Sequence, residues 1–310
     1  MNAVLKLTPK NGKKMKKIAL LMLFASASPA YADVPWSVSG EFEYDHVSVK
    51  DADTTNDMSK AEIAVSADVG DDVSAEIVVA GVDAATDNDS SVDDGIEIDA
   101  AIVTYRMAQQ NLSFDVGLLA APVGQFETLS VSDPLGLGEV ETTRNRGLVA
   151  TLAPNDAFSI TAFSGTMDDT ASTSVNGGNI QLNWKAATFN IGHISDTAGS
   201  ISDAALTYAV NVSHAGYTLI AEKVEMDDAA NTGFTHIEMN YGFNTNELPI
   251  TLGVGQSTQS QNTASDTTQT SLTMAIEVTE NLGLTFDTTN LEAPGVADAD
   301  QTALKIGFSF

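Results

Sequence analysis

The chain lacks cysteine altogether, and basic residues are scarce in it. Its 310 residues include 14 lysines and arginines against 42 aspartates and glutamates. A chain without cysteine has no disulfide framework and no thiol-based metal or redox chemistry. A chain this acidic is not expected to bind nucleic acid, because neutralising phosphates requires clustered lysine and arginine. The same acidity is common in exported proteins of saline habitats, so it does not by itself point to one function.

Long apolar runs are also missing, and the clearest short one lies at the N-terminus. The stretch IALLMLFA follows a cluster of four lysines and precedes an Ala-Tyr-Ala site. It is far shorter than the roughly 20 residues of a spanning helix. These features predict a signal peptide over 1–32 with cleavage before Asp33, and Met15 offers an alternative start. The leader carries six basic and no acidic residues, so the mature chain over 33–310 has 8 basic against 42 acidic residues, a net charge of −34.

The mature chain is rich in alternation between apolar and polar residues. In the last segment, Leu304, Ile306 and Phe308 alternate with Lys305 and Gly307. This period of two is typical of strands with one apolar face. Two of the expected strands, 187–195 and 214–225, alternate poorly. The pattern predicts sixteen strands, over 36–47, 60–69, 73–83, 95–106, 111–120, 145–153, 157–166, 178–185, 187–195, 202–211, 214–225, 234–243, 247–257, 268–278, 281–290 and 302–310.

The connections between these strands are alternately short and long. A soluble exported sandwich has no reason for this order, whereas an outer-membrane barrel has short periplasmic turns and long extracellular loops. We therefore predict an all-β fold, a transmembrane antiparallel up-and-down barrel of about 16 strands in the outer membrane. Closure is required because unpaired strand edges cannot cross lipid. The long connections are expected over 48–59, 84–94, 121–144, 167–177, 196–201, 226–233, 258–267 and 291–301.

Acidic residues occupy the non-apolar phase of many predicted strands. Sixteen strands leave a lumen too wide for side chains to fill, so these carboxylates are expected to line water. Such a wall favours cations over anions, and no cofactor is required. The terminal Phe310 is expected to be read by the barrel assembly machinery. The predicted lumen wall comprises Glu41, Glu43, Glu62, Glu76, Glu97, Asp99, Asp115 and Glu238, with Asp68, Glu277 and Asp287 at the same phase.

The longest irregular segment, 121–144, contains PVGQFETLSVSDPL and is unusually apolar for a loop. Fully solvated loops gain nothing from five or six large hydrophobic residues, so this segment is predicted to fold into the barrel and narrow it. Two of the three mature arginines lie at its end. We expect these two arginines either to form an eyelet across the lumen or only to anchor the segment by salt bridges. The predicted constriction residues are Pro122, Gly124, Phe126, Glu127, Asp133, Glu139, Glu141, Arg144 and Arg146.

The same segment, GLLAAPVGQFETLSVSDPLGLGEVETTRNRG, resembles the hallmark segment of the LbtU-type siderophore porins. In that pattern a Pro-Phe-Gly-x-Phe-Glu-Thr motif precedes Ser-Asp-Pro-Leu and an acidic Glu-Thr. Val123 replaces the expected phenylalanine, and 136–138 also departs from the pattern. The resemblance covers about thirty residues and implies a porin fold and, as an alternative function, uptake of iron chelates without a TonB-dependent plug. The matching residues are Pro122, Gly124, Phe126, Glu127, Thr128, Ser132, Asp133, Pro134, Leu135, Glu141 and Thr142.

Three other interpretations remain open. A barrel enzyme would use His236, two residues from Glu238, as a base, but no serine-centred motif accompanies it. Acidic loops over 51–57 and 83–93 could bind Ca²⁺, although they lack the EF-hand order and a solvated loop is favoured. A structural or adhesive barrel would have no open path for solutes through its lumen. The favoured prediction is a porin for small hydrophilic solutes, with membrane lipid and lipopolysaccharide as surroundings and a homotrimer as its assembly.

Overall fold

The computed structural model describes residues 35–50, 54–81, 96–123, 128–130, 134–135, 144–167, 174–195, 204–228, 232–245, 248–261, 264–295 and 299–310. At 55–60, 96–97, 144–145, 167 and 264 the description covers the backbone only. The predicted signal peptide therefore lies outside the described residues. All sixteen predicted strands are confirmed, and a single 3-10 turn, η1 (Ala108–Gln110), occurs among the described residues. The strands are β1 (Trp36–Val49), β2 (Thr55–Asp68), β3 (Val73–Gly81), β4 (Ile96–Met107), β5 (Leu112–Ala120), β6 (Arg144–Asn155), β7 (Phe158–Met167), β8 (Ser174–Trp184), β9 (Ala187–Ile194), β10 (Ala205–His214), β11 (Tyr217–Met226), β12 (Gly233–Thr245), β13 (Leu248–Gln261), β14 (Ala264–Thr279), β15 (Leu282–Glu292) and β16 (Ala299–Ser309).

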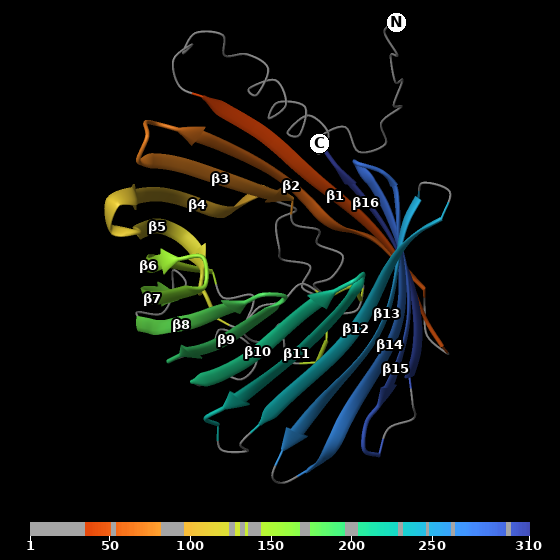
Figure 1. Cartoon of the computed structure of the whole chain (residues 1–310). Coiled ribbons are helices and arrows are strands. Elements are labelled where there is room, and N and C mark those ends of the chain that lie inside the picture. Colours follow the sequence, from red (N-terminus) through yellow and green to blue (C-terminus); the bar gives the residue numbers. More distant parts are fainter. Residues whose placement is uncertain are drawn as a thin grey trace, which may run out of the picture.

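The strands form one closed antiparallel barrel in sequence order, as predicted. Each strand pairs with its neighbours along the chain, and β1 closes the sheet against β16 (Figure 1). The closing register runs from Glu41 opposite Ser309 to Val49 opposite Gln301. Closure leaves no strand edge unpaired, which is the condition for β-structure in lipid. Separately, no helix in the described ranges is long and apolar enough to cross a membrane.

The outer face of the barrel is apolar, and the inner face is polar. On β12, Ile237 and Met239 are 52% and 51% exposed, whereas His236 and Glu238, which alternate with them, are each 2% exposed. This inverts the order of a soluble protein and suits an outer face in contact with lipid. Aromatic side chains gather near the short-turn end of the barrel, where the rings of Tyr217 and Tyr241 stack 4.4 Å apart. Such rings are typical of the membrane–water interface.

Several strands extend beyond their predicted ends. The predicted loop 258–267 is wrong, because β13 continues to Gln261 and β14 begins at Ala264, with Gln259 still paired to Thr267. This connection is short, so the predicted alternation of short and long connections fails there. The residues involved are mainly serine, threonine and glutamine. Backbone pairing beyond the lipid does not require apolar side chains, and the strand ends therefore left no periodic signal.

A register shift in β4 changes which residues face inward. The shift lies between Val78 and Val79 of β3, where Ala100 and Ile98 of β4 pair on either side of Asp99. An unbroken period of two along β4 would put Ile102 on the same outer face as Ile98, which is 58% exposed, but Ile102 packs against the buried cluster of the inner wall. The two isoleucines face opposite sides because one extra residue in a strand reverses the faces of all residues beyond it.

Candidate functional site: the inner wall and the segment after β5

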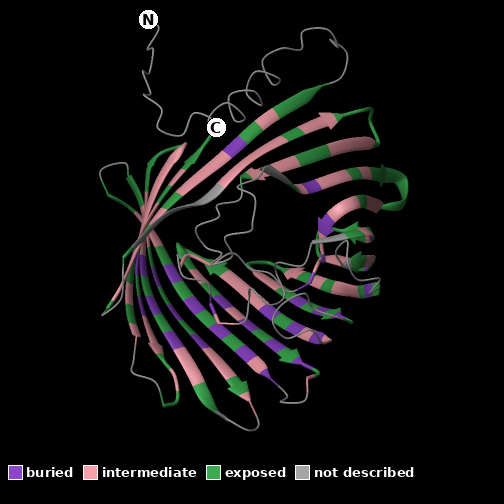
Figure 2. Cartoon of the chain, turned by 180° about the vertical axis from the view of Figure 1, so that it is seen from behind, coloured by how far each residue is buried: buried purple, intermediate pink, exposed green. Residues whose placement is uncertain are grey.

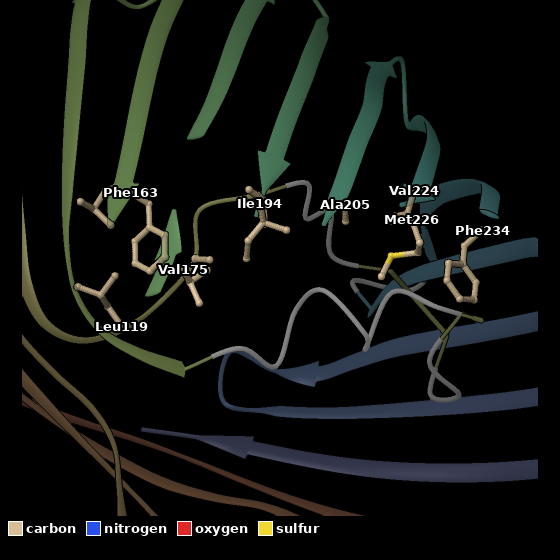
Figure 3. Packing of buried hydrophobic residues seen from close by; sticks show 11 residues of the cluster. Leu119, Phe163, Val175, Ile194, Ala205, Val224, Met226 and Phe234 are labelled. Carbon is tan, nitrogen blue, oxygen red and sulfur yellow. The ribbon is translucent and has the colours of Figure 1, made fainter. Parts of the chain in front are cut away.

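An apolar patch covers part of the inner wall beside the chain that leaves β5. Ala121 and Val123 of this segment are 3% and 2% exposed, and Leu135 further along packs against the same patch. Figure 3 shows its labelled wall side chains gathered around one region of the barrel interior. Burial here requires a covering layer, and the described parts of the segment contribute to it. The buried wall residues are Leu119, Val149, Phe163, Val175, Ile194, Ala205, Val224, Met226 and Phe234.

This patch explains the poor alternation of the predicted strand 214–225. In the half of β11 nearest the short turn that follows β10, Tyr217 and Leu219 face outward. In the half nearest the long loop, Lys223 and Glu225 face outward, and Val224 and Met226 face inward. The outer surface at that height suits water rather than lipid, so the apolar side chains pack inside instead.

Glycines leave room for the segment against the wall. A Cβ atom built on Gly192 of β9 would lie 3.4 Å from Val123 and 2.6 Å from the hydroxyl of Thr207. A Cβ on Gly253 of β13 would lie 2.9 Å from Cδ2 of Leu129. Glycine inside a strand often marks the close approach of another chain segment. The Gly253-x-Gly255 spacing is the sequence signal from which this contact could have been predicted.

Two carboxylates of the wall bind the described residues 128–130. The backbone N–H of Leu129 donates a hydrogen bond to Oε1 of Glu238 at 2.9 Å. The hydroxyl of Ser130 donates to Oδ2 of Asp287, also at 2.9 Å. Glu238 and Asp287 are 2% and 4% exposed, so these charge-assisted bonds are shielded from water. They place Leu129 and Ser130 directly against β12 and β15.

The predicted histidine lies in the same network. His236 contacts Ser257 through Nδ1 at 2.9 Å, and its Nε2 lies 3.5 Å from Oε2 of Glu238. Ser257 was not among the predicted residues, because the β12–β13 register alone brings it opposite His236. The three groups have the order of a hydrolase triad, but each is at most 3% exposed and offers no access to a substrate. The neighbouring backbone is paired in the ladder, so it presents no oxyanion site.

The opposite part of the wall carries carboxylates that are exposed or half-buried among the described residues. Glu41 on β1 faces Glu62 on β2, and Asp115 on β5 accepts a hydrogen bond from Thr104 at 2.6 Å. Glu76 on β3 is exposed, and Glu43 binds Lys305 of β16 at 3.0 Å. Figure 2 shows the buried residues, in purple, concentrated on the strands of the other part of the barrel. Among the described residues, the inner wall is therefore divided into a covered side and a more exposed side, which we call the open acidic side.

Other predicted residues of the site have different positions. Arg146 pairs with Leu118 and shares the outward face with Leu148, so the predicted role in an eyelet does not fit its register. Asp99 lies at the register shift of β4 and is half-buried. Pro122, in the segment after β5, is also half-buried. Arg144 begins β6 and Glu97 lies in β4, and the description of both covers the backbone only. Outside the described residues lie Gly124, Phe126, Glu127, Asp133, Glu139 and Glu141, and the acidic stretches 51–53 and 83–93.

The predicted terminal signal residue takes part in closing the barrel. Phe310 exchanges two backbone hydrogen bonds with Gly40, of 3.1 and 3.2 Å. Its ring covers Gly40, where a Cβ would lie 2.5 Å from the ring, and it stacks on Phe42 at 6.2 Å. The last residue therefore extends the β1–β16 pairing. Recognition by the assembly machinery stays a prediction.

Comparison with known proteins supports the fold. No family model and no curated protein matches the chain, so the resemblance to LbtU-type siderophore porins is not confirmed. In vitro folded OmpT of Vibrio cholerae is 12% identical with a TM-score of 0.67, covering 89% of this chain and 98% of its own. An anion-selective porin from Comamonas acidovorans is 13% identical with a TM-score of 0.63, covering 90% and 100%.

A third similar structure is OmpF of Salmonella typhi in complex with daunomycin. It is 13% identical with a TM-score of 0.62, covering 89% of this chain and 97% of its own. Identities this low establish the fold alone. The closed sixteen-strand barrel and its apolar outer face agree with that likeness. The chain has the fold of the outer-membrane porins, and its apolar outer face is the face that such a barrel presents to lipid.

Proposed function

We propose that this chain is a porin, which passively admits small hydrophilic solutes through a water-filled lumen and prefers cations. The observation that carries the proposal is the row of exposed or half-buried carboxylates on β1, β2, β3 and β5. Carboxylates around a water-filled path attract cations and repel anions. Lys305 is the basic side chain that β16 contributes to this region, and it is already paired with Glu43.

The segment after β5 supplies the narrowing in this proposal. Its residues 121–123, 128–130 and 134–135 include side chains and backbone in contact with the covered side of the wall. Solutes would therefore pass between these residues and the open acidic side. Because the solved anion-selective porin shares the fold, the preference must be judged from the charges of this chain and not from the fold.

The test is the reversal potential of the refolded mature chain in a planar bilayer under a KCl gradient. Stepwise currents with a cation-directed reversal potential are expected. Replacing Glu41 and Glu62 together by glutamine should shift that potential toward zero. The matched control replaces Glu225 and Asp227 by glutamine and asparagine, which removes the same charge from exposed positions at the loop end. An equal shift in both variants would contradict a role for the acidic wall.

Each alternative has its own test. Folded protein that inserts without current steps would favour a structural or adhesive barrel. Loss of growth on a ferric siderophore in a deletion strain would favour uptake of iron chelates. Esterase or protease turnover that disappears in His236→Ala would favour an enzyme. Among the described residues, the contacts of His236 with Ser257 and Glu238 bear on the enzyme alternative, and all three residues are buried.

We also propose a homotrimer. One solved OmpT of Vibrio cholerae is described as a trimer form, and this chain shares its fold at 11% identity. Currents that open in groups of three equal steps would support the trimer. A single step size, together with the mass of one subunit in detergent, would contradict it.

A further inference from the structure

We propose that Glu238 and Asp287 are positioning residues that set the width of the lumen, whereas the carboxylates of the opposite wall set its ion preference. The inference rests on the proposed porin function. It assigns different roles to two groups of acids that the sequence places in one set. Width and charge selectivity would then be determined on opposite sides of one barrel.

The first argument is accessibility. The side chains of Glu238 and Asp287 are 2% and 4% exposed, whereas that of Glu43 on the open side is 18% exposed and Glu76 is exposed. A permeating cation interacts with carboxylates that it can approach through water. The two buried acids are shielded from that path, so their charge contributes little to selectivity.

The second argument is the way in which both acids are held. Oδ1 of Asp287 accepts a hydrogen bond from Thr273 at 2.9 Å, and Oδ2 accepts one from Thr289 at 3.2 Å. Oε1 of Glu238 accepts one from Asn240 at 2.6 Å. These bonds fix the carboxylates before Leu129 and Ser130 bind to them. Fixed acceptors give up little conformational entropy on binding a donor, which is what an anchor requires.

The third argument is the shape of the wall between the two anchors. β13 and β14 separate β12 from β15, and their inward residues there are Gly253, Gly255, Ser271 and Thr273. Cδ2 of Leu129 occupies the space in which a Cβ on Gly253 would lie. Ser271 and Thr273 are 6% and 3% exposed although they face the barrel interior. Small residues flanked by two acceptors thus form a seat for the segment.

The fourth argument is the cost of losing the anchors. Without the carboxylate of Glu238, the N–H of Leu129 would be buried against the wall with no acceptor, which is unfavourable. The segment would regain hydrogen bonds by moving into the water of the lumen. The open acidic side has no part in these contacts, and its field would remain.

The experiment compares Glu238→Ala/Asp287→Ala with Glu238→Gln/Asp287→Asn. The alanine pair removes the acceptors, and the amide pair removes the charges but keeps an acceptor oxygen at each position. In the alanine pair we expect conductance to rise about twofold, as for a widened water-filled constriction, and larger neutral sugars to enter liposomes. The reversal potential should stay cation-directed in both. The amide pair should keep a conductance close to that of the native chain.

A second measurement reports directly on the seat. Because the chain has no cysteine, Ser271→Cys introduces a single thiol beneath the segment. We expect that thiol to resist a charged thiol reagent in the native background and to react in the alanine pair. Ser39→Cys, at an exposed position of the inner face of β1, is the control and should react in both backgrounds.

Unchanged conductance together with a protected thiol in the alanine pair would overturn the inference. If the alanine pair does not fold, Gly253→Ala tests the same seat, because the new Cβ would meet Leu129 at 2.9 Å and Asn240 at 2.4 Å. That variant should also widen the lumen and expose the thiol at 271. Loss of cation preference in the native chain would contradict the proposed function instead, and the thiol measurement would still decide the anchoring.

Discussion

Glu43 and Lys305 face each other across the seam at which the barrel closes, with carboxylate oxygen and ammonium nitrogen 3.0 Å apart. Glu43 belongs to the first strand and Lys305 to the last, so the pair joins residues 262 positions apart. Both side chains are partly exposed, and the pair therefore contributes at most about 1 kcal/mol to stability. Its main effect is on the charge of the lumen wall.

The first prediction concerns this pair. Lys305→Met removes a positive charge from the acidic side and should increase cation preference, whereas Glu43→Gln should decrease it. Both shifts follow from the sign of the wall charge. The reversal potential in a KCl gradient measures them. Shifts in the same direction for the two variants would show that neither side chain contributes through its charge.

The second prediction concerns Gly117 on β5. Its φ is +146°, and a Cβ there would lie 1.8 Å from the carbonyl oxygen of Ala101. Gly117→Ala should destabilise the barrel by at least about 2 kcal/mol, through backbone strain and this collision. The control is Gly307→Ala, where a Cβ meets nothing within 4 Å. Denaturant titration of both variants in detergent measures the difference, and equal midpoints would disprove it.

The third prediction concerns the last residue. Phe310→Ala removes the ring that covers Gly40 and stacks on Phe42, so it should weaken the closing seam by about 1 kcal/mol. Phe286→Ala removes an outward ring of β15 away from that seam and is the control. The temperature at which the folded band disappears in unboiled gel electrophoresis compares the two. A larger loss for the variant at 286 would contradict the role of Phe310 in closure.

The fourth prediction concerns the connection between β11 and β12. The hydroxyl and backbone N–H of Thr232 both donate to the carboxylate of Asp228, at 2.6 Å each. These bonds lower the pKa of Asp228 below its usual 3.8, with the hydroxyl as the larger cause. A lowered pKa means that the stabilisation is present above pH 3.8 and is lost as the pH falls through the folded value.

Amide exchange at Thr232 measures this effect. Protection should fall in that acidic range for the native chain and be weak at every pH in Asp228→Ala. Asp227→Ala changes the exposed neighbour and should leave the protection unchanged. Protection that persists in Asp228→Ala would show that the carboxylate does not hold the turn.

The sequence by itself determined the class of fold. Period-two alternation is a local property of each strand. Every strand of the barrel has lipid on its outer side and a wide lumen on its inner side, so the same pattern recurs in all of them. The sixteen strands and the acidic inner phase therefore followed from local patterns. The strand ends within 258–267 were predicted as a loop, because backbone pairing outside lipid leaves no apolar signal in the sequence.

The tertiary structure alone decided which residues meet. Leu129 reaches Glu238 across 109 positions, and Ser130 reaches Asp287 across 157, which no local pattern encodes. The face of Ile102 depended on one extra residue in β4, and that of Arg146 on the β5–β6 register. Ser257 became the partner of His236 in the same way. Register is fixed by the pairing of all sixteen strands together, so a single strand cannot reveal it.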